Sequence, residues 1–173
     1  MATNDTLREL FVVGLRNVHA VENQALSIMK PQVARIENYP EVAERLRLHI
    51  DETNAQIARV EEILSGLGES HSSLKDTALS LSGGMAALTH SVAGDEIVKN
   101  SFANYAFEHF EIASYKSLLT MAEDGGFGAA TPLLKESLGE EQAMAQWLDD
   151  HLADVTRRYA KLYAEGGSSA AKV

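Results

Sequence analysis

Hydrophobic residues recur at intervals of three and four along four long stretches of the chain, which is the pattern of amphipathic helices. The spacing predicts helices over residues 6–29, 40–67, 95–123 and 130–159. Pro31 is expected to end the first helix, because proline cannot continue a helix interior, and Pro40 suits the first turn of the second. The sequence therefore predicts an all-α protein.

The connections between these helices differ in length. The first and second helices are joined by a short link, and the glycine-rich residues 124–128 predict a turn between the third and fourth. Residues 66–94 are rich in glycine and serine and form a long crossover, within which residues 76–91 can form an additional helix. One long crossover is typical of the ferritin-like four-helix bundle. We expect one domain over residues 1–165 and a flexible tail over 166–173.

Glutamates lie on the predicted core faces of the first and fourth helices. Glu22 shares a face with the apolar residues Phe11, Leu15, Val18, Ala25 and Met29. Glu141 lies on the clearest stripe of the chain, which is formed by Leu134, Leu138, Ala145, Leu148, Leu152, Val155 and Tyr159. A buried carboxylate is costly unless it is paired or bound to a cation, so both acids need a partner.

The second and third helices carry acids beside their predicted core faces. In the second helix, His49 and Glu52 are one turn apart and flank an apolar stripe. In the third, Glu108 and Glu111 lie next to a predicted core stripe made of Val98, Phe102, Tyr105, His109, Ile112 and Leu119. A spacing of three places both members of each pair on one helix face. Acids from all four helices are therefore expected to converge.

Two divalent cations at the centre of the bundle would satisfy these acids together. Four carboxylates supply four negative charges against four positive ones, and imidazole adds a nitrogen donor that iron, manganese and zinc accept. We expect two iron ions, with manganese as the alternative metal. The candidate ligands are Glu22, His49, Glu52, Glu108, Glu111 and Glu141.

The pattern leaves alternatives open. The ferritin-like plan uses Glu-x-x-His pairs, whereas this chain has none and carries the reversed order, as at His49 and Glu52. His49 is either a ligand or a residue that orients one, and Glu108 either binds metal or faces the next helix. The competing hypothesis is that arginine neutralises each acid. Arg59 is the main candidate, but it lies about 10 Å along the helix from Glu52, so we expect it to pair elsewhere.

The amino-acid composition and net charge exclude several types of site and partner. The chain has 173 residues, 45% of them hydrophobic, which suits one domain with one core. The absence of cysteine excludes disulfides, iron–sulfur clusters and zinc–thiolate sites. Fifteen basic against 25 acidic side chains leave a net charge of −10, which disfavours nucleic acid as a partner. Without a membrane-spanning apolar stretch or a secretory signal pattern, we expect a cytoplasmic protein.

Four segments carry a resemblance to a known family: Val21–Gln24, His49–Thr53, Glu108–Tyr115 and Leu133–Glu141. Through these segments, and over residues 7–160, the sequence resembles the YciE/YciF family of ferritin-like, stress-associated bacterial proteins. The resemblance implies a ferritin-like bundle, commonly a homodimer, with a di-iron-type site near the helix centres. It matches Glu22, Glu52, Glu111 and Glu141 to the inward acids of the family.

Two functions are therefore expected to compete. The first is a di-metal carboxylate protein of the bacterial stress response, which binds iron and reacts with oxygen or peroxide. The second is a stress-induced structural or interaction protein whose metal site stabilises the fold or is vestigial, without turnover. The first predicts oxidation of bound iron, and the second predicts only a change in thermal stability when metal is removed.

Overall fold

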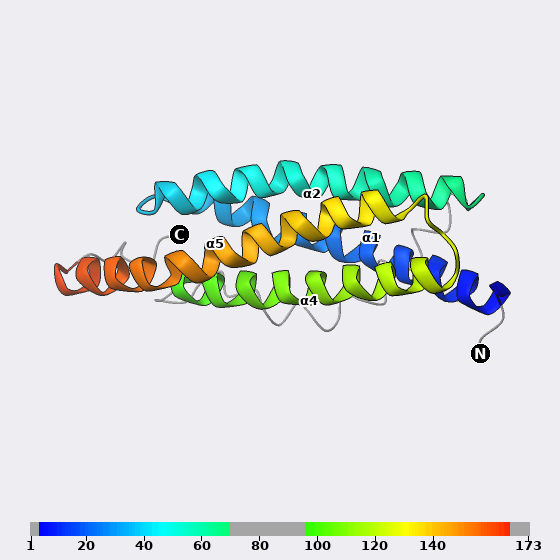
Figure 1. Cartoon of the computed structure of the whole chain (residues 1–173). Helices are drawn as coiled ribbons and strands as arrows, with labels where there is room; N and C mark the ends of the chain where they lie inside the picture. Colours follow the sequence, from blue (N-terminus) through cyan, green and yellow to red (C-terminus); the bar gives the residue numbers. More distant parts are fainter. Residues whose placement is uncertain (1–3, 70–95, 167–173) are drawn as a thin grey trace.

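The computed structural model describes residues 4–69 and 96–166, which form four long α-helices (Figure 1). These are α1 (Asn4–Arg35), α2 (Pro40–Gly66), α4 (Glu96–Asp124) and α5 (Thr131–Ala164). The described ranges contain no strand, so the predicted all-α class is confirmed. Within the same ranges, none of the helices has an apolar stretch long enough to cross a membrane. The helix expected over 76–91, and the predicted tail from residue 167 on, lie outside the described residues.

The four helices form two antiparallel pairs that pack side by side (Figure 1). Short links join α1 to α2 and α4 to α5, and the two pairs pack together mainly through α1 against α4 and α2 against α5. The link from α4 to α5 depends on Gly126, whose φ of 74° lies in the left-handed region that glycine adopts without strain. Phe127 then stacks on Phe11 with 4.8 Å between ring centroids, which anchors this turn against α1.

The first helix does not end before Pro31. It continues through the proline to Arg35, so the predicted end of this helix was wrong. Gln32 is buried and exchanges two hydrogen bonds with the Asn104 amide of α4, at 3.2 and 2.9 Å. Val33 also packs against the core beyond the proline. These tertiary contacts offset the backbone hydrogen bond that proline cannot donate.

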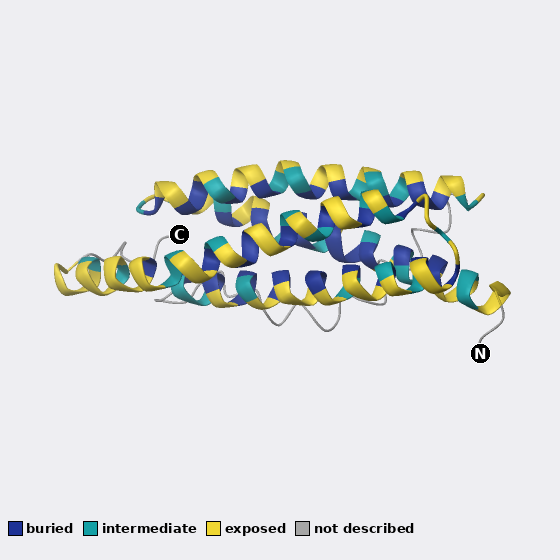
Figure 2. Ribbon diagram, viewed as in Figure 1, coloured by how far each residue is buried: buried dark blue, intermediate teal, exposed yellow. Residues whose placement is uncertain are grey.

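The interior is divided into two apolar clusters with a polar layer between them. Buried positions follow the inward faces of all four helices (Figure 2). One cluster contains Val21, Ala25, Leu26, Met29, Tyr39, Val42, Leu46, Ile97, Phe107, Met144, Leu148 and Val155. The other contains Phe11, Val12, Leu15, Val18, Val60, Ile63, Leu64, Tyr115, Leu118, Ala122, Ala130 and Leu134. The polar layer consists of Glu22, His49, Thr53, Gln56, Glu108, Glu111, Ser137 and Glu141, all of them buried.

Two of the four predicted core faces need correction. On α4, Phe102 is 53% exposed and His109 is exposed, whereas the neighbouring stripe of Asn104, Glu108, Glu111 and Tyr115 is buried. On α2, His49 and Gln56 are fully buried instead of flanking the core. In the middle of both helices, the buried face carries more polar residues than a core face usually does. A prediction from hydrophobic spacing therefore assigns these buried polar residues to the surface. The predicted stripe of α1 is confirmed. The stripe of α5 is confirmed in part, because Leu138, Leu152 and Tyr159 are only partly buried.

Candidate metal centre

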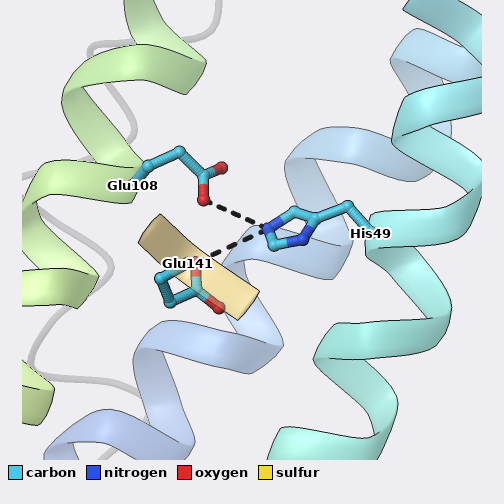
Figure 3. Close-up of side chains that lie close together, drawn as sticks. All are labelled: His49, Glu108 and Glu141. Carbon is cyan, nitrogen blue, oxygen red and sulfur yellow. Dashed lines mark ion pairs between the residues drawn. The ribbon is translucent and has the colours of Figure 1, made fainter. Parts of the chain in front are cut away.

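His49 of α2 lies at the middle of the polar layer, where three helices meet. Its side chain is 1% exposed. Its Nε2 atom is 3.2 Å from Glu108 Oε2 on α4 and 3.6 Å from Glu141 Oε2 on α5 (Figure 3). The three residues offer one nitrogen and two oxygen ligand atoms that all lie within 4.8 Å of one another. This group can hold a divalent transition metal, since iron, manganese and zinc accept such mixed donors.

Glu22 of α1 and Glu111 of α4 complete the polar layer with two more buried carboxyl groups. Glu22 Oε1 accepts a hydrogen bond of 2.6 Å from the hydroxyl group of Tyr115. Glu111 is close enough to the charges of Glu22, Glu141 and Glu108 for all three to raise its pKa. The structure thus brings buried carboxyl groups from α1, α4 and α5 together around His49 of α2.

Several carboxylate oxygens in this layer are buried without a hydrogen bond to any described residue. They are Glu22 Oε2, both oxygens of Glu111, and Glu141 Oε2. Glu108 Oε2 instead faces the His49 ring, at 3.2 Å from Nε2. Leaving one buried acceptor unsatisfied costs about 1–3 kcal/mol, and the cost is unusual for so many oxygens at one place. A divalent cation satisfies oxygen acceptors without requiring hydrogen-bond donors. The residues present therefore fit a metal.

Burial changes the protonation of these acids. It raises the pKa of Glu22 to about 8, against the opposing effects of the Tyr115 hydrogen bond and the His49 charge. Burial and the nearby Glu108 raise the pKa of Glu141 to about 10. Burial, together with the charge of Glu22, raises the pKa of Glu111 well above its usual range. In the absence of a cation Glu22 and Glu141 keep their protons at neutral pH, and a metal would displace those protons.

His49 carries the compensating positive charge when no metal is bound. Burial acts to lower the pKa of its imidazole, but the charge of Glu108 and the hydrogen bonds with Glu108 and Glu52 outweigh burial and raise the pKa to about 10. An imidazolium cannot bind a metal, so coordination would also release the proton on Nε2. Metal and proton thus compete for one position between His49, Glu108 and Glu141.

Glu52 occupies the outer side of His49. Its Oε2 atom accepts hydrogen bonds from His49 Nδ1, at 2.8 Å, and from Arg45 Nη1, at 3.0 Å. The Glu52 side chain is 31% exposed, unlike the other predicted ligands. In this geometry Glu52 orients the imidazole ring, which is how carboxylates commonly support a metal-binding histidine. Whether Glu52 also binds metal, as the sequence predicts, stays a prediction.

The arginines of α2 do not neutralise the acids of the polar layer that lie around His49. Arg59 pairs with Glu136 at 2.6 Å and with Glu140 at 2.7 Å, so the expectation that it pairs elsewhere than Glu52 is confirmed. The arginine that does reach Glu52 is Arg45, which sequence reasoning did not single out as its partner. Arg45 and Arg59 are both seven residues from Glu52, so distance along the helix does not distinguish the two arginines.

Two further buried residues of the polar layer were missed as site residues. Gln56 is fully buried, and its amide nitrogen donates to Glu141 Oε1 and, at 3.0 Å, to Glu140 Oε2. Ser137 lies one turn before Glu141 and is buried at the same level of the bundle. Gln56 follows Glu52 by four residues, so a search for polar residues on the acidic face of α2 would have found it.

The fold and the site together define a ferritin-like helical bundle with a buried carboxylate–histidine cluster at its centre. The chain belongs to the family described as a domain of unknown function, DUF892, which matches residues 6–161. It is 30% identical over 148 residues to protein YciF of Escherichia coli strain K12, which covers 80% of this chain and 85% of that protein. The predicted family resemblance is confirmed.

Solved structures show the same fold. A protein from Xanthomonas campestris superposes with a TM-score of 0.76 at 30% identity, covering 91% of this chain and 99% of that one. The stress protein YciF of Escherichia coli superposes with a TM-score of 0.68 at 25% identity, covering 89% and 97% of the two chains. The likeness extends over nearly the full length in both cases, so the bundle described above is the fold of the family.

Proposed function

We propose that this protein binds two divalent cations in the polar layer, with iron as the expected metal and manganese as the alternative. The observation that carries the proposal is the group of buried carboxylate oxygens without hydrogen bonds around His49. His49, Glu108 and Glu141 would hold one cation. Glu22 and Glu111 would supply the remaining charge for a second.

The charges of the layer support two ions rather than one. Glu22, Glu108, Glu111 and Glu141 are all buried and together carry four negative charges when deprotonated. Two divalent cations balance this charge, whereas with a single ion two of the buried carboxyl groups would have to keep their protons. His49 then acts as a neutral nitrogen donor, and Glu52 keeps the imidazole oriented through its outer nitrogen.

An iron pair at this site would supply redox chemistry toward oxygen or peroxide. The residues of the chain would bind and orient the ions, and the two flanking apolar clusters would exclude bulk water. One solved relative is described as an Escherichia coli stress protein. This likeness supports a role in a bacterial stress response. We propose that the chain acts there as a cytoplasmic homodimer that consumes an oxidant.

Anaerobic titration with Fe²⁺, followed by exposure to air, tests this proposal. We expect close to two ions per chain before air and an absorbance change on oxidation. The Glu108→Gln variant should lose at least one ion, while Glu123→Gln, which changes an exposed acid on the same helix, should bind as the wild type does. Binding of less than one ion per chain at saturating Fe²⁺ would reject the proposal.

A second function is favoured by the ion pairs that the layer already contains. The imidazolium of His49 lies between Glu52 and Glu108, so the bundle can fold around this charge without metal. A structural or interaction protein whose metal site is stabilising or vestigial is consistent with that arrangement. It predicts that a chelator lowers the unfolding temperature or leaves it unchanged, and that the iron-loaded protein consumes neither oxygen nor peroxide.

A further inference from the structure

A chain of hydrogen bonds leads from an ion pair at the bundle surface to the carboxylate of Glu22. Arg59 Nη1 donates to Ser137 Oγ at 3.3 Å, and the Ser137 hydroxyl group lies close enough to Tyr115 to act on the pKa of its phenol. The Tyr115 hydroxyl group then donates to Glu22 Oε1 at 2.6 Å. Ser137, Tyr115 and Glu22 are fully buried, so bulk water does not compete for these bonds. This series of side chains runs from α2 through α5 and α4 to α1.

The direction of donation along this chain is determined at its outer end. A guanidinium group has donors only, so Ser137 must accept from Arg59, and its single hydroxyl hydrogen is left to donate to Tyr115. This agrees with the effect of Ser137 on Tyr115: burial raises the pKa of the phenol, and the Ser137 bond acts to lower it. Tyr115 accepts from Ser137 and therefore gives its own hydrogen to Glu22.

The outer end of the chain is itself held in place. Arg59 forms ion pairs with Glu136 at 2.6 Å and Glu140 at 2.7 Å. Both acids lie on α5, on either side of Ser137 in the sequence, so the guanidinium is held over that serine. A fixed donor at the outer end favours donation in the order Arg59, Ser137, Tyr115 and Glu22.

We propose that Tyr115 is a positioning residue, which holds Glu22 by Oε1 and so presents Oε2 to a cation. Oε2 is buried and has no hydrogen bond among residues 4–69 and 96–166. The inference rests on the proposed metal site. It adds the means by which α1, the one described helix that lies outside the His49–Glu108–Glu141 group, contributes its ligand. Ser137 and Arg59 act through Tyr115 by holding its hydroxyl in the donating orientation.

Titration with Co²⁺ alone, followed by visible absorption, tests this role. We expect Tyr115→Phe to weaken one of two Co²⁺ equivalents by about tenfold, as loss of a residue that orients a ligand commonly does, and to change the absorption of that equivalent. The matched control is Tyr105→Phe on the same helix, whose hydroxyl group contacts Asp149. It should match the wild type in both affinity and spectrum.

The possible results distinguish a failure of the Tyr115 role from a failure of the proposed metal site. If the wild type binds no Co²⁺ and no Fe²⁺, the metal site itself is refuted, and the role of Tyr115 with it. If the wild type binds two ions and Tyr115→Phe binds both with unchanged affinity and spectrum, only the positioning role is overturned. A change in unfolding temperature with unchanged Co²⁺ binding also overturns it, because it would show a packing role alone.

A second variant covers the case in which Tyr115→Phe does not fold. Ser137→Ala keeps the phenol and removes the hydrogen bond that orients it. We expect a loss of roughly threefold in Co²⁺ affinity for the same equivalent, which corresponds to one neutral hydrogen bond. Wild-type affinity and spectrum in Ser137→Ala would contradict the chain of donation described above.

Discussion

The polar layer and the two apolar clusters are equally buried, but they are stable for opposite reasons. Leu15 and Leu46 in the clusters are removed from water, which is favourable in itself. Glu22 and Glu141 in the layer are just as inaccessible, and their burial is unfavourable unless something compensates it. The apolar clusters therefore explain why the bundle folds, whereas the acids of the polar layer need a bound cation to compensate their burial. Variants that change one region and not the other test whether the two roles are separate.

The largest effect is expected from removing an acid of the layer. Glu141→Ala deletes a carboxylate that lies 3.6 Å from His49 Nε2, and metal binding at this position should be abolished. The metal-free variant should be as stable as the wild type or more so, because a buried acid has been removed. Elemental analysis and urea unfolding measure the two effects. Wild-type metal content in this variant would show that the site lies elsewhere.

Truncation of a large apolar side chain should have the opposite effects: it should lower the stability and leave metal binding unchanged. Leu46→Ala in the first cluster should lower the free energy of unfolding by about 2–5 kcal/mol, through lost burial and the cavity left behind. The loss should be the same in the presence of metal and of chelator, measured by urea unfolding, and the number of bound ions should not change. A variant that loses metal in proportion to its stability would show that the two regions are not separable.

The stability of the metal-free protein should fall as the pH rises above neutral. The folded-state pKa values of Glu22, Glu141 and His49 are raised to about 8, 10 and 10. The folded state thus binds more protons than the unfolded state between the ordinary and the raised values. Each such proton costs about 1.4 kcal/mol of stability per pH unit in that window. Chelator-treated protein should therefore unfold progressively more easily from pH 5 toward pH 10.

Metal should reverse this dependence, because bound cations replace the protons of the layer. Thermal unfolding of the metal-loaded protein should be flat or should rise over the same pH range. Parallel curves with and without metal would argue that the acids of the layer do not take part in binding.

The smallest effect is expected at Glu52. Glu52→Gln keeps a side chain of the same shape beside His49 Nδ1 but removes its charge, and metal affinity should fall about tenfold if Glu52 only orients the imidazole. Calorimetric titration with Mn²⁺ gives this number. A loss of more than a hundredfold would instead support the sequence prediction that Glu52 binds metal.

The sequence predicts the fold well because α1 and α5 carry strong apolar periodicity, and that periodicity alone places Glu22 and Glu141 in the core. The face of α4 was misread for a physical reason. Its buried side contains Asn104, Glu108 and Glu111, while Phe102 faces outward, so hydrophobicity hardly distinguishes the two sides. When a helix supplies several polar groups to a site, the spacing of its hydrophobic residues does not identify its buried face.

The contacts around the acids could not be predicted in the same way. The bond between Tyr115 and Glu22 joins residues 93 positions apart, and the bond from Gln56 to Glu141 joins residues 85 apart. Such pairs depend on how the helices are rotated against one another, which no single helix determines. Contacts within one helix, such as His49 with Glu52, follow from spacing and were within reach of the sequence.

Anomalous X-ray scattering at the iron edge, from crystals grown with Fe²⁺, would locate the bound iron itself. We expect two anomalous peaks in the polar layer, one of them bounded by His49, Glu108 and Glu141 and the other beside Glu22 and Glu111. Saturated crystals with no peak in this layer, and with its carboxyl groups bonded only to one another and to His49, would contradict this expectation.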